Sequence, residues 1–549
     1  MSELLLTSRG LAVRESQLNE SQRQDPKITQ AALAGIRRGI ERELVRTSPQ
    51  GELTTTAHPT RLGAALTHPY ITTDFAEAQL ELVTPALTDR QATFSTLTEL
   101  HQFVARNIAS DETLWAASMP PVLPAEHDIR IADYGKSNAG RLKVRYREGL
   151  ANRYGKRMQL ISGIHYNFSL PNTVWQLLYQ QQTGVDVEES NLAAFISERY
   201  FHLIRNVLRH GWVIPYLFGA TPALDKSYLQ GREHNLTQWD TDTYYLPWAT
   251  SLRVSNLGYS SSEQSAYPLS FNNQKAYLTD LYRVLTKPSE RYTHFDHEQQ
   301  LNASVLQLEN ELYGSVRPKI VSAELRPLMA MCHHGVEYIE LRSLDNNPYL
   351  PLGINEAQSQ FLDLFLTYCA LAPSPEIDEQ ERQLLMARQE LVATQGRQPD
   401  LMLPTLDGDV LLAELGHQLL DAMGTLAAGF DQHNDIQHDK HVSAISNQSY
   451  FAAIERERAK FNNSELTPSA KLLADMKKHQ LGHNALIHAL SEQHTTQHRE
   501  SGLDPVAQQK LVDLAQESLV AQAQREAQQE MSFDEFLKQK NNLQCDCEI

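Results

Sequence analysis

Cysteine is scarce in this chain. Its 549 residues include four cysteines, Cys332, Cys369, Cys545 and Cys547, too few for the disulfide framework that stabilises small secreted domains. Cys369 lies in an apolar run and is expected to be a small buried hydrophobic residue. Cys545 and Cys547 stand at the extreme C-terminus, where a frayed tail with two exposed thiols is the simplest expectation and a soft-metal or redox pair is the alternative. The scarcity of cysteine favours a protein of a reducing compartment.

Long hydrophobic runs are also lacking. No segment approaches the roughly 18 consecutive apolar residues that a membrane-spanning helix needs. Leu4, Leu5 and Leu6 form too short an apolar segment for a signal peptide, and no positively charged region precedes them. The sequence therefore predicts a cytoplasmic protein that has no membrane partner.

An excess of basic residues is absent as well. The chain has 67 acidic and 49 basic residues and a net charge of −18, which disfavours nucleic acid as a partner but leaves room for a local basic pocket. The G-x-G-x-x-G nucleotide fingerprint is missing. The loop Asp133–Arg141 resembles half of a phosphate-binding P-loop, but Arg130 stands where that motif needs its first glycine. A nucleotide, if bound, must therefore be held by another geometry.

What the sequence does contain is a set of acids at alternate positions. Glu41 and Glu43 lie two residues apart in the segment Gly39–Val45. In a strand both carboxylates would leave the same face, about 6.5 Å apart. Carboxylates at that distance repel each other unless a cation lies between them, and Mg²⁺ prefers such oxygen ligands. A solvated edge strand of alternating charge is the simpler interpretation for this pair alone.

The same period of two recurs in four further apolar segments. Their polar positions are Glu77, Gln79 and Glu81; His165 and Asn167; Glu309 and Glu311; and Glu340 and Arg342. One sheet with a polar, mostly acidic concave face would explain all five segments. A sheet that faces water is the alternative, but lysine and threonine would then be expected among the acids.

Composition divides the chain into four parts. Residues 1–25 are a loose polar lead-in, 26–374 are predicted to form one catalytic domain, 375–530 a helical C-terminal region, and 531–549 a flexible tail. The C-terminal region has helical spacing throughout and is rich in Glu, Gln, Ala, Leu and His. We interpret its clustered histidines as surface residues, because no acid or thiol completes a metal-ligand set; they are His433, His438, His441, His479 and His483.

Taken in order, the motifs resemble those of the bacterial type of glutamate–cysteine ligase, from about residue 30 to about residue 372. The motifs that carry the resemblance are Gly39–Glu43, Ile71–Glu77, Ser162–Ser169, Tyr245–Arg253, Glu309–Tyr313 and Val336–Asp345. The resemblance implies an α+β, glutamine-synthetase-like fold, in which a curved antiparallel sheet flanked by helices binds metal ions on its concave face. It also implies ATP-dependent joining of the glutamate γ-carboxylate to the amine of cysteine.

The resemblance further assigns roles to individual residues. The implied ligands of Mg²⁺, or of Mn²⁺, are Glu41, Glu43, Asp74, Glu81, His165 and Glu340. The implied cysteine pocket consists of Tyr146, Leu150, Gln159, Arg253, Tyr259 and Tyr313. Asn167 would lie on the glutamate side, and Arg342, with Arg147, would face the phosphates of ATP beside Glu340. A monomer with small-molecule substrates is expected.

Other interpretations stay open. His165 could be a satisfied core histidine, Tyr259 and Tyr313 ordinary core aromatics, and Arg342 the partner of a neighbouring acid. For the whole protein the alternatives are a ligase of the same fold with another amine acceptor, a non-catalytic nucleotide- or metal-binding protein, and a metal-dependent phosphohydrolase.

Overall fold

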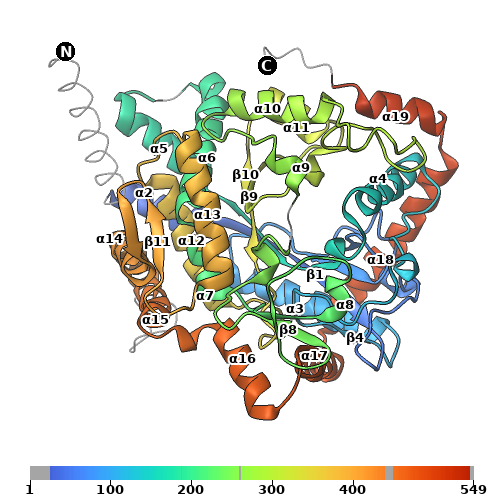
Figure 1. Cartoon of the computed structure of the whole chain (residues 1–549). Coiled ribbons are helices and arrows are strands. Elements are labelled where there is room, and N and C mark those ends of the chain that lie inside the picture. Colours follow the sequence, from blue (N-terminus) through green and yellow to red (C-terminus); the bar gives the residue numbers. More distant parts are fainter. Residues whose placement is uncertain (1–24, 187, 259–260, 439–448, 544–549) are drawn as a thin grey trace.

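A curved antiparallel sheet forms the centre of the molecule (Figure 1). The computed structural model describes residues 25–186, 188–258, 261–438 and 449–543. Within these ranges the sheet has seven strands. Six follow one another in the order β2 (Ile71–Thr73), β3 (Gln79–Val83), β1 (Arg37–Thr47), β5 (Ile164–Ser169), β10 (Tyr338–Leu344) and β9 (Val316–Lys319), and β4 (Thr113–Leu114) pairs with the end of β1.

The register of the sheet brings its polar residues together. Glu41 lies opposite His165 and Glu43 opposite Glu81, while Glu340 lies between Asn167 on one side and Arg317 on the other. Because successive side chains of a strand point to opposite faces, these residues share one face. The acidic concave face predicted from the period of two is therefore present on β1, β3, β5 and β10.

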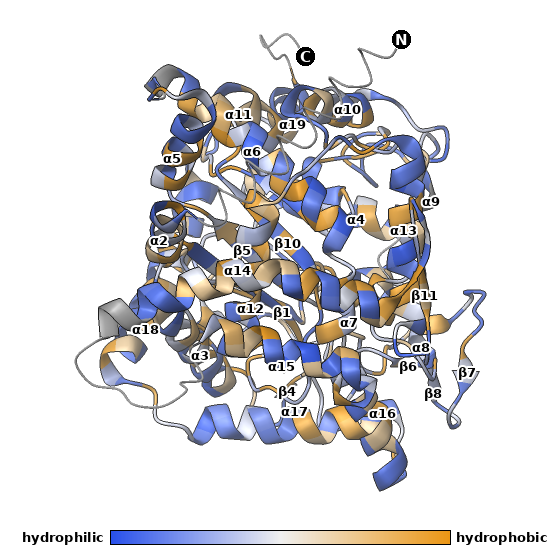
Figure 2. Cartoon of the chain, turned by 90° about the vertical axis from the view of Figure 1, so that its left-hand side faces the viewer, coloured by the Kyte–Doolittle hydropathy of each residue, from blue (hydrophilic) through white to orange (hydrophobic). Residues whose placement is uncertain are grey.

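The other face of the sheet is covered by helix α12 (Glu356–Leu371), which a capping box at Asn355 begins. Asp363 of α12 pairs with Arg38 of β1 at 3.0 Å and accepts a hydrogen bond of 2.8 Å from the Tyr166 hydroxyl. Helices α14 (Leu412–His438) and α15 (Tyr450–Asn462) pack on α12 in a further layer (Figure 2). Apolar side chains of all these elements form the largest core cluster, so the concave face is left for the polar residues.

The remaining helices surround the sheet. Those before residue 375 are α2 (Pro26–Gly35), α3 (Arg90–Asn107), α4 (Asn138–Tyr154), α5 (Asn172–Thr183), α6 (Glu189–His210), α7 (Val213–Phe218), α8 (Lys226–Leu229), α9 (Ser262–Ser265), α10 (Gln274–Thr286) and α11 (Pro327–His334). A small sheet consists of β6 (Ala223–Asp225), β8 (Thr243–Tyr245) and β7 (Thr237–Gln238). No helix within the described ranges is both long and apolar enough to cross a bilayer.

The C-terminal region is mostly helical, as predicted. It contains α13 (Glu379–Gln395), α14, α15, α16 (Pro468–His479), α17 (His483–Glu500), α18 (Pro505–Ala527) and α19 (Phe533–Asn541). The hairpin of β11 (Met402–Thr405) and β12 (Gly408–Leu411) was not predicted. Helix α19 lies within the segment 531–549 that was expected to be a flexible tail, while Cys545 and Cys547 lie outside the described residues.

Three local predictions were wrong. Glu77 belongs to a bend before β3, where its carboxylate accepts hydrogen bonds from the backbone N–H groups of His58 and Asp133. Glu309–Glu311 forms a 3₁₀ turn and not a strand. In this turn the two acids reach different partners: Glu309 pairs with Arg326 at 2.7 Å and Glu311 with Arg153 at 3.0 Å. His483 is buried and is not a surface residue.

Candidate active site

A cavity of about 610 Å³ lies on the concave face of the sheet. Strands β1, β3, β5 and β10 form its floor, α4 and the segment 308–327 form its walls, and α18 and α19 contribute to its rim. Twelve of the predicted site residues line it: Glu41, Glu43, Asp74, Glu81, Tyr146, Arg147, Leu150, Gln159, His165, Tyr313, Glu340 and Arg342. Residues up to 301 positions apart in the sequence, Glu41 and Arg342, therefore meet in one place.

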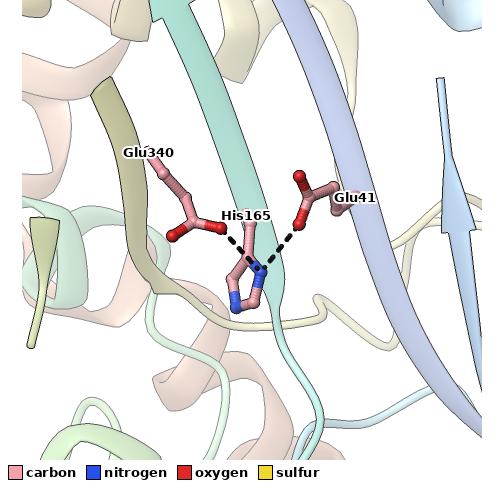
Figure 3. A group of neighbouring side chains, drawn as sticks. All are labelled: Glu41, His165 and Glu340. Carbon is pink, nitrogen blue, oxygen red and sulfur yellow. Dashed lines mark hydrogen bonds and ion pairs between the residues drawn. The ribbon is translucent and has the colours of Figure 1, made fainter. Parts of the chain in front are cut away.

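Three side chains from adjacent strands converge on the floor of the cavity (Figure 3). The Nδ1 atom of His165 lies 3.2 Å from Glu41 Oε2 and 3.7 Å from Glu340 Oε1. The ligand atoms of the three residues lie within 4.8 Å of one another, which is suited to holding one metal ion. Burial favours the neutral form of Glu41, but the contact with His165 outweighs it and lowers the pKa of this carboxyl.

The second part of the acidic floor is made by Glu43, Glu81 and Asp74. His165 Nε2 lies 3.5 Å from Glu43 Oε1, and the backbone N–H of Gly163 donates to Glu43 Oε2 at 2.8 Å. Burial, together with the charge of Asp74, raises the pKa of Glu43. Burial also raises the pKa of Glu81 well above its usual range, and the charges of Glu41, Asp74 and Glu43 add to the effect. The side chains around Glu43 and Glu81 therefore do not offset the free-energy cost of ionising these two carboxyl groups.

The donor set fits divalent cations. Five carboxylates and one imidazole face one cavity, and carboxylate oxygens with occasional imidazole nitrogen are the ligands of Mg²⁺ and Mn²⁺. Within the described residues, the buried Oε2 of Glu340 accepts no hydrogen bond, although Arg342 Nη1 lies 3.2 Å from it as an ion-pair partner. Burial and mutual repulsion raise the pKa values of Glu43 and Glu81, and a bound cation would offset both effects.

Basic residues surround Glu340 on the side of β9. Arg342 Nη1 lies 3.2 Å from Glu340 Oε2, Lys319 Nζ lies 3.4 Å from Oε1, and Arg317 Nη1 lies 3.9 Å from Oε2. Burial opposes ionisation of Glu340, but Arg342 and Lys319, with His165, hold the pKa of its carboxyl well below its usual range. Arg342 therefore pairs with a neighbouring acid, Glu340, as the alternative interpretation of the sequence expected. It also places a positive charge at the cavity.

The opposite wall of the cavity also carries positive charge. Lys143 and Arg147 are four residues apart on α4, and both lie over the Tyr134 ring, at 4.8 and 4.5 Å from its centroid. Burial and the neighbouring Arg147 lower the pKa of Lys143 to about 8. Arg525 of α18 lines the same part of the cavity. An anion between the two walls would therefore meet cations on both sides.

A small amphipathic pocket adjoins the acidic floor. Gln159 Nε2 donates to the Tyr313 hydroxyl at 3.0 Å, and Tyr146 and Leu150 come from α4. Burial, with the nearby Glu311, raises the pKa of Tyr146 well above its usual range, so this phenol stays protonated and able to donate a hydrogen bond. The arrangement offers an apolar surface with a few polar atoms, as ligand pockets do.

Two predicted site residues lie behind the cavity wall. Asn167 Nδ2 donates to Glu41 Oε1 at 2.7 Å and so orients that carboxylate. Arg253 donates from Nη2 to the backbone carbonyl of Arg342 at 2.8 Å and is 3 % exposed. A third predicted residue, Tyr259, lies outside the described residues.

Several cavity residues were not predicted from the sequence. Lys143 precedes Arg147 by one helical turn, and Arg317 and Lys319 have the period of two, so both pairs had a detectable signal. Arg525, Phe536 and Lys540 come from α18 and α19, more than 180 residues after β10, the last strand of the central sheet along the chain. Only the folded chain brings them to the cavity.

Comparisons with known proteins identify the family of this chain. The sequence model of the family described as Glutamate-cysteine ligase matches residues 22–392. A glutamate–cysteine ligase of Azotobacter vinelandii is 44% identical over 514 residues, which are 92% of this chain and 94% of that protein. One of Pseudomonas entomophila is 43% identical over 505 residues, 91% of this chain and 92% of that protein. Both matches are longer than the span of the family model, so the likeness extends into the C-terminal region.

The fold is shared with a solved structure. The crystal structure of a glutamate–cysteine ligase from Francisella tularensis, in complex with AMP, has a TM-score of 0.84 and 33% sequence identity. The structural match covers 92% of this chain and 98% of the Francisella tularensis chain. The acidic concave sheet, the surrounding cations and these matches lead to one conclusion: the chain belongs to the glutamate–cysteine ligase family.

Proposed function

We propose that this protein joins the γ-carboxylate of L-glutamate to the amine of L-cysteine and consumes ATP. The products are γ-glutamylcysteine, ADP and phosphate. The observation that carries the proposal is the convergence of five carboxylates and His165 with cations on both walls of one cavity, in a chain of this family. Such a site suits phosphoryl transfer, in which several anionic groups must be brought together.

The reaction needs two steps because a carboxylate is a poor electrophile. The γ-carboxylate oxygen first attacks the γ-phosphorus of ATP, so that γ-glutamyl phosphate forms and ADP leaves. The amine of cysteine, after loss of its ammonium proton, then attacks the acyl carbon, and the tetrahedral adduct expels phosphate. Bound Mg²⁺ or Mn²⁺ would stabilise the negative charge that develops on the transferring phosphoryl group. We assign the ligands of these ions to Glu41, Glu43, Asp74, Glu81, His165 and Glu340.

The protein's own side chains would position the substrates and supply positive charge to the phosphates. Arg342 presents a planar guanidinium that suits phosphate oxygens, and Glu340 fixes it from 3.2 Å. Arg147 would contact the same phosphates from the α4 side. Tyr146, Gln159, Tyr313 and Leu150 would frame the amino-acid substrate, while Asn167 and Arg253 act through Glu41 and Arg342. Filling of the cavity by the substrates would protect the acyl phosphate from hydrolysis by bulk water.

The pocket beside the floor favours a ligase over a phosphohydrolase. A phosphohydrolase needs no amphipathic pocket next to its phosphate site, whereas a ligase must seat an amino acid there. The volume of about 610 Å³ has room for a nucleotide tail and two small amino acids. All elements of the cavity come from one chain, so we propose that a monomer is active. We place the reaction in the cytoplasm, where cysteine stays reduced.

The decisive experiment detects γ-glutamylcysteine by mass spectrometry after incubation with glutamate, cysteine, ATP and Mg²⁺. We expect one product molecule for each phosphate released. A panel of amines in place of cysteine tests the acceptor, and a faster reaction with another amine would assign a different ligase. Phosphate release without any amine would indicate a phosphohydrolase, and nucleotide binding without turnover would indicate a binding protein.

A further inference from the structure

Helix α19 presents two different faces to the rest of the protein. Phe533 is buried, and the Arg141 guanidinium carbon lies 4.1 Å from the centroid of its ring. Leu537, one turn later, is half-buried against a core cluster. Phe536 and Lys540, also one turn apart, line the active-site cavity instead. The helix therefore packs on α4 with one face and turns an aromatic ring and an ammonium group to the cavity.

Contacts at both ends fix α19 in this position. At its start, Ser532 and Glu535 form a capping box, and Asn138 Nδ2 of α4 donates to the Met531 carbonyl at 3.0 Å. At its end, Arg326 Nη1 donates to the Lys540 carbonyl at 3.1 Å. Arg326 itself is held by an ion pair of 2.7 Å with Glu309. The helix thus bridges the two walls of the cavity.

The wall that α19 joins continues directly from the cations around Glu340. Strand β9 ends at Lys319, whose ammonium lies 3.4 Å from Glu340. The segment that follows it, from Ala323 to Pro327, lines the same cavity. Its lining residues are the apolar Ala323, Leu325 and Pro327 and the charged Glu324 and Arg326. Beyond the cations at β9 and β10, the part of the cavity at α19 therefore combines apolar side chains with charged ones.

A nucleotide has the same combination, since a flat apolar base is joined to a polyanion. A purine base stacks on aromatic rings, and its phosphates pair with lysine and arginine. Phe536 is half-buried, so one part of its ring is accessible from the cavity. The Lys540 ammonium lies over the Phe536 ring, 5.8 Å from its centroid, so a cation and an aromatic ring stand together at this end of the cavity.

We propose that α19 forms the outer end of the nucleotide site: the Phe536 ring packs against the purine base, and the Lys540 ammonium pairs with the polyphosphate. This inference rests on the proposed function, because it assumes that the phosphates lie at Arg342 and Lys319. It gives the C-terminal region a direct part in substrate binding, beyond its role in covering the sheet.

The test compares binding of ADP with binding of inorganic tripolyphosphate, which lacks a base, by calorimetry of the full-length protein in Mg²⁺. We expect Phe536→Ala to weaken ADP binding about tenfold and to leave tripolyphosphate binding unchanged. Phe536→Trp keeps a stacking surface and should bind ADP as the wild type does. Phe451→Ala, at an exposed phenylalanine of α15, is the matched control and should change neither ligand.

Lys540→Ala should weaken ADP and tripolyphosphate alike, by about fivefold. Lys538→Ala removes an exposed lysine of the same helix that does not line the cavity, and it should have no effect. Equal loss of both ligands in Phe536→Ala would indicate structural damage and overturn the assignment of the base. Unchanged ADP binding in Phe536→Ala would overturn it as well.

Steady-state kinetics tests the placement of α19 at the nucleotide site independently of the binding measurements. The KM for ATP should rise in Phe536→Ala, while the KM values for glutamate and cysteine and the kcat stay within twofold. A rise in the KM for cysteine alone would place α19 at the amino-acid pocket and contradict the inference. If the wild type formed no γ-glutamylcysteine but the ADP-selective loss persisted, the proposed ligase would fail and the base site would stand.

Discussion

The imidazole of His165 and the carboxylate of Glu41 face each other across β5 and β1, with 3.2 Å between Nδ1 and Oε2. Their backbones are register partners, so the contact follows from strand pairing and not from a flexible loop. Rigid elements hold ligand groups more accurately than loops do. The next strand adds Glu340, and the floor of the cavity is thereby set by the hydrogen bonding of the sheet itself.

Replacement of Glu340 by glutamine tests the floor of the cavity. Glu340→Gln removes the charge that fixes Arg342 at 3.2 Å and Lys319 at 3.4 Å, while it keeps the shape of the side chain. We expect kcat to fall by roughly 10²-fold or more, because a group that organises charge in the transition state is lost. Formation of γ-glutamylcysteine in Mg²⁺ and saturating ATP is the measurement.

A control for Glu340→Gln lies three residues earlier. Glu337 is exposed at the start of the same strand and does not line the cavity, so Glu337→Gln should keep wild-type turnover. Near-normal turnover of Glu340→Gln itself would remove Glu340 from the site.

Metal binding should appear as a change in stability. Burial and neighbouring carboxylates raise the pKa of Glu81 and of Glu43, so this cluster destabilises the metal-free protein. We expect Mg²⁺ at about 100 times its Kd to stabilise the wild type by about 3 kcal/mol, seen as a higher Tm. Glu81→Gln should raise the Tm of the metal-free protein and reduce the further rise with Mg²⁺.

Glu517→Gln, on the surface of α18, serves as the comparison for Glu81→Gln. It should leave both the metal-free Tm and the Mg²⁺ response at wild-type values. A metal-free Tm that falls in Glu81→Gln would show that the crowded carboxylates are not a source of instability.

Local periodicity was enough to predict the floor of the site. Glu41, Glu43 and Glu81 stand on strands whose alternation is visible in the sequence, and the structure places all three on the concave face. The same pattern misassigned Glu309 and Glu311, because two acids two residues apart are too short a pattern to distinguish a strand from a 3₁₀ turn, in which these positions do not share a face. There the long-range ion pairs to Arg326 and Arg153, at 2.7 and 3.0 Å, decide the conformation.

Other parts of the site depend on contacts that the sequence does not reveal. Phe536 and Lys540 enter the cavity because Phe533 packs under Arg141 and because Arg326 holds the end of α19. A short polar segment near a terminus carries no trace of such partners. For the same reason the boundary predicted at residues 374 and 375 stays a prediction, since helices from beyond it reach the cavity.

Close packing at Gly163 gives a prediction for stability. A Cβ atom at this position would lie 2.0 Å from Arg253 Nη2, while the Gly163 N–H donates to Glu43. Gly163→Ala must therefore displace Arg253 from the carbonyl of Arg342. We expect a loss of about 1–3 kcal/mol in the free energy of unfolding, together with lower turnover. Chemical denaturation measures the first and product formation the second.

Gly502 is the matched position for Gly163→Ala. A Cβ atom there meets no heavy atom within 4 Å, so Gly502→Ala should change the free energy of unfolding by only a few tenths of a kcal/mol. Equal stability of the two variants would show that Arg253 moves aside without cost.

The buried His483 should make the protein sensitive to acid. Burial lowers the pKa of this imidazole to about 4 from its ordinary value of 6.5, and its ring lies edge-on to Trp115 with 6.3 Å between centroids. Between these two values the unfolded chain binds a proton that the folded protein does not, so stability is full above pH 6.5 and falls as the pH decreases toward 4. For this group alone the loss from pH 7 to pH 5 is about 2 kcal/mol.

His483→Phe keeps an aromatic ring and should flatten the decline of Tm with acid by that share, whereas His479→Gln, at an exposed histidine, should follow the wild-type curve. Parallel Tm curves for the wild type and His483→Phe would mean that His483 opens to solvent before it is protonated.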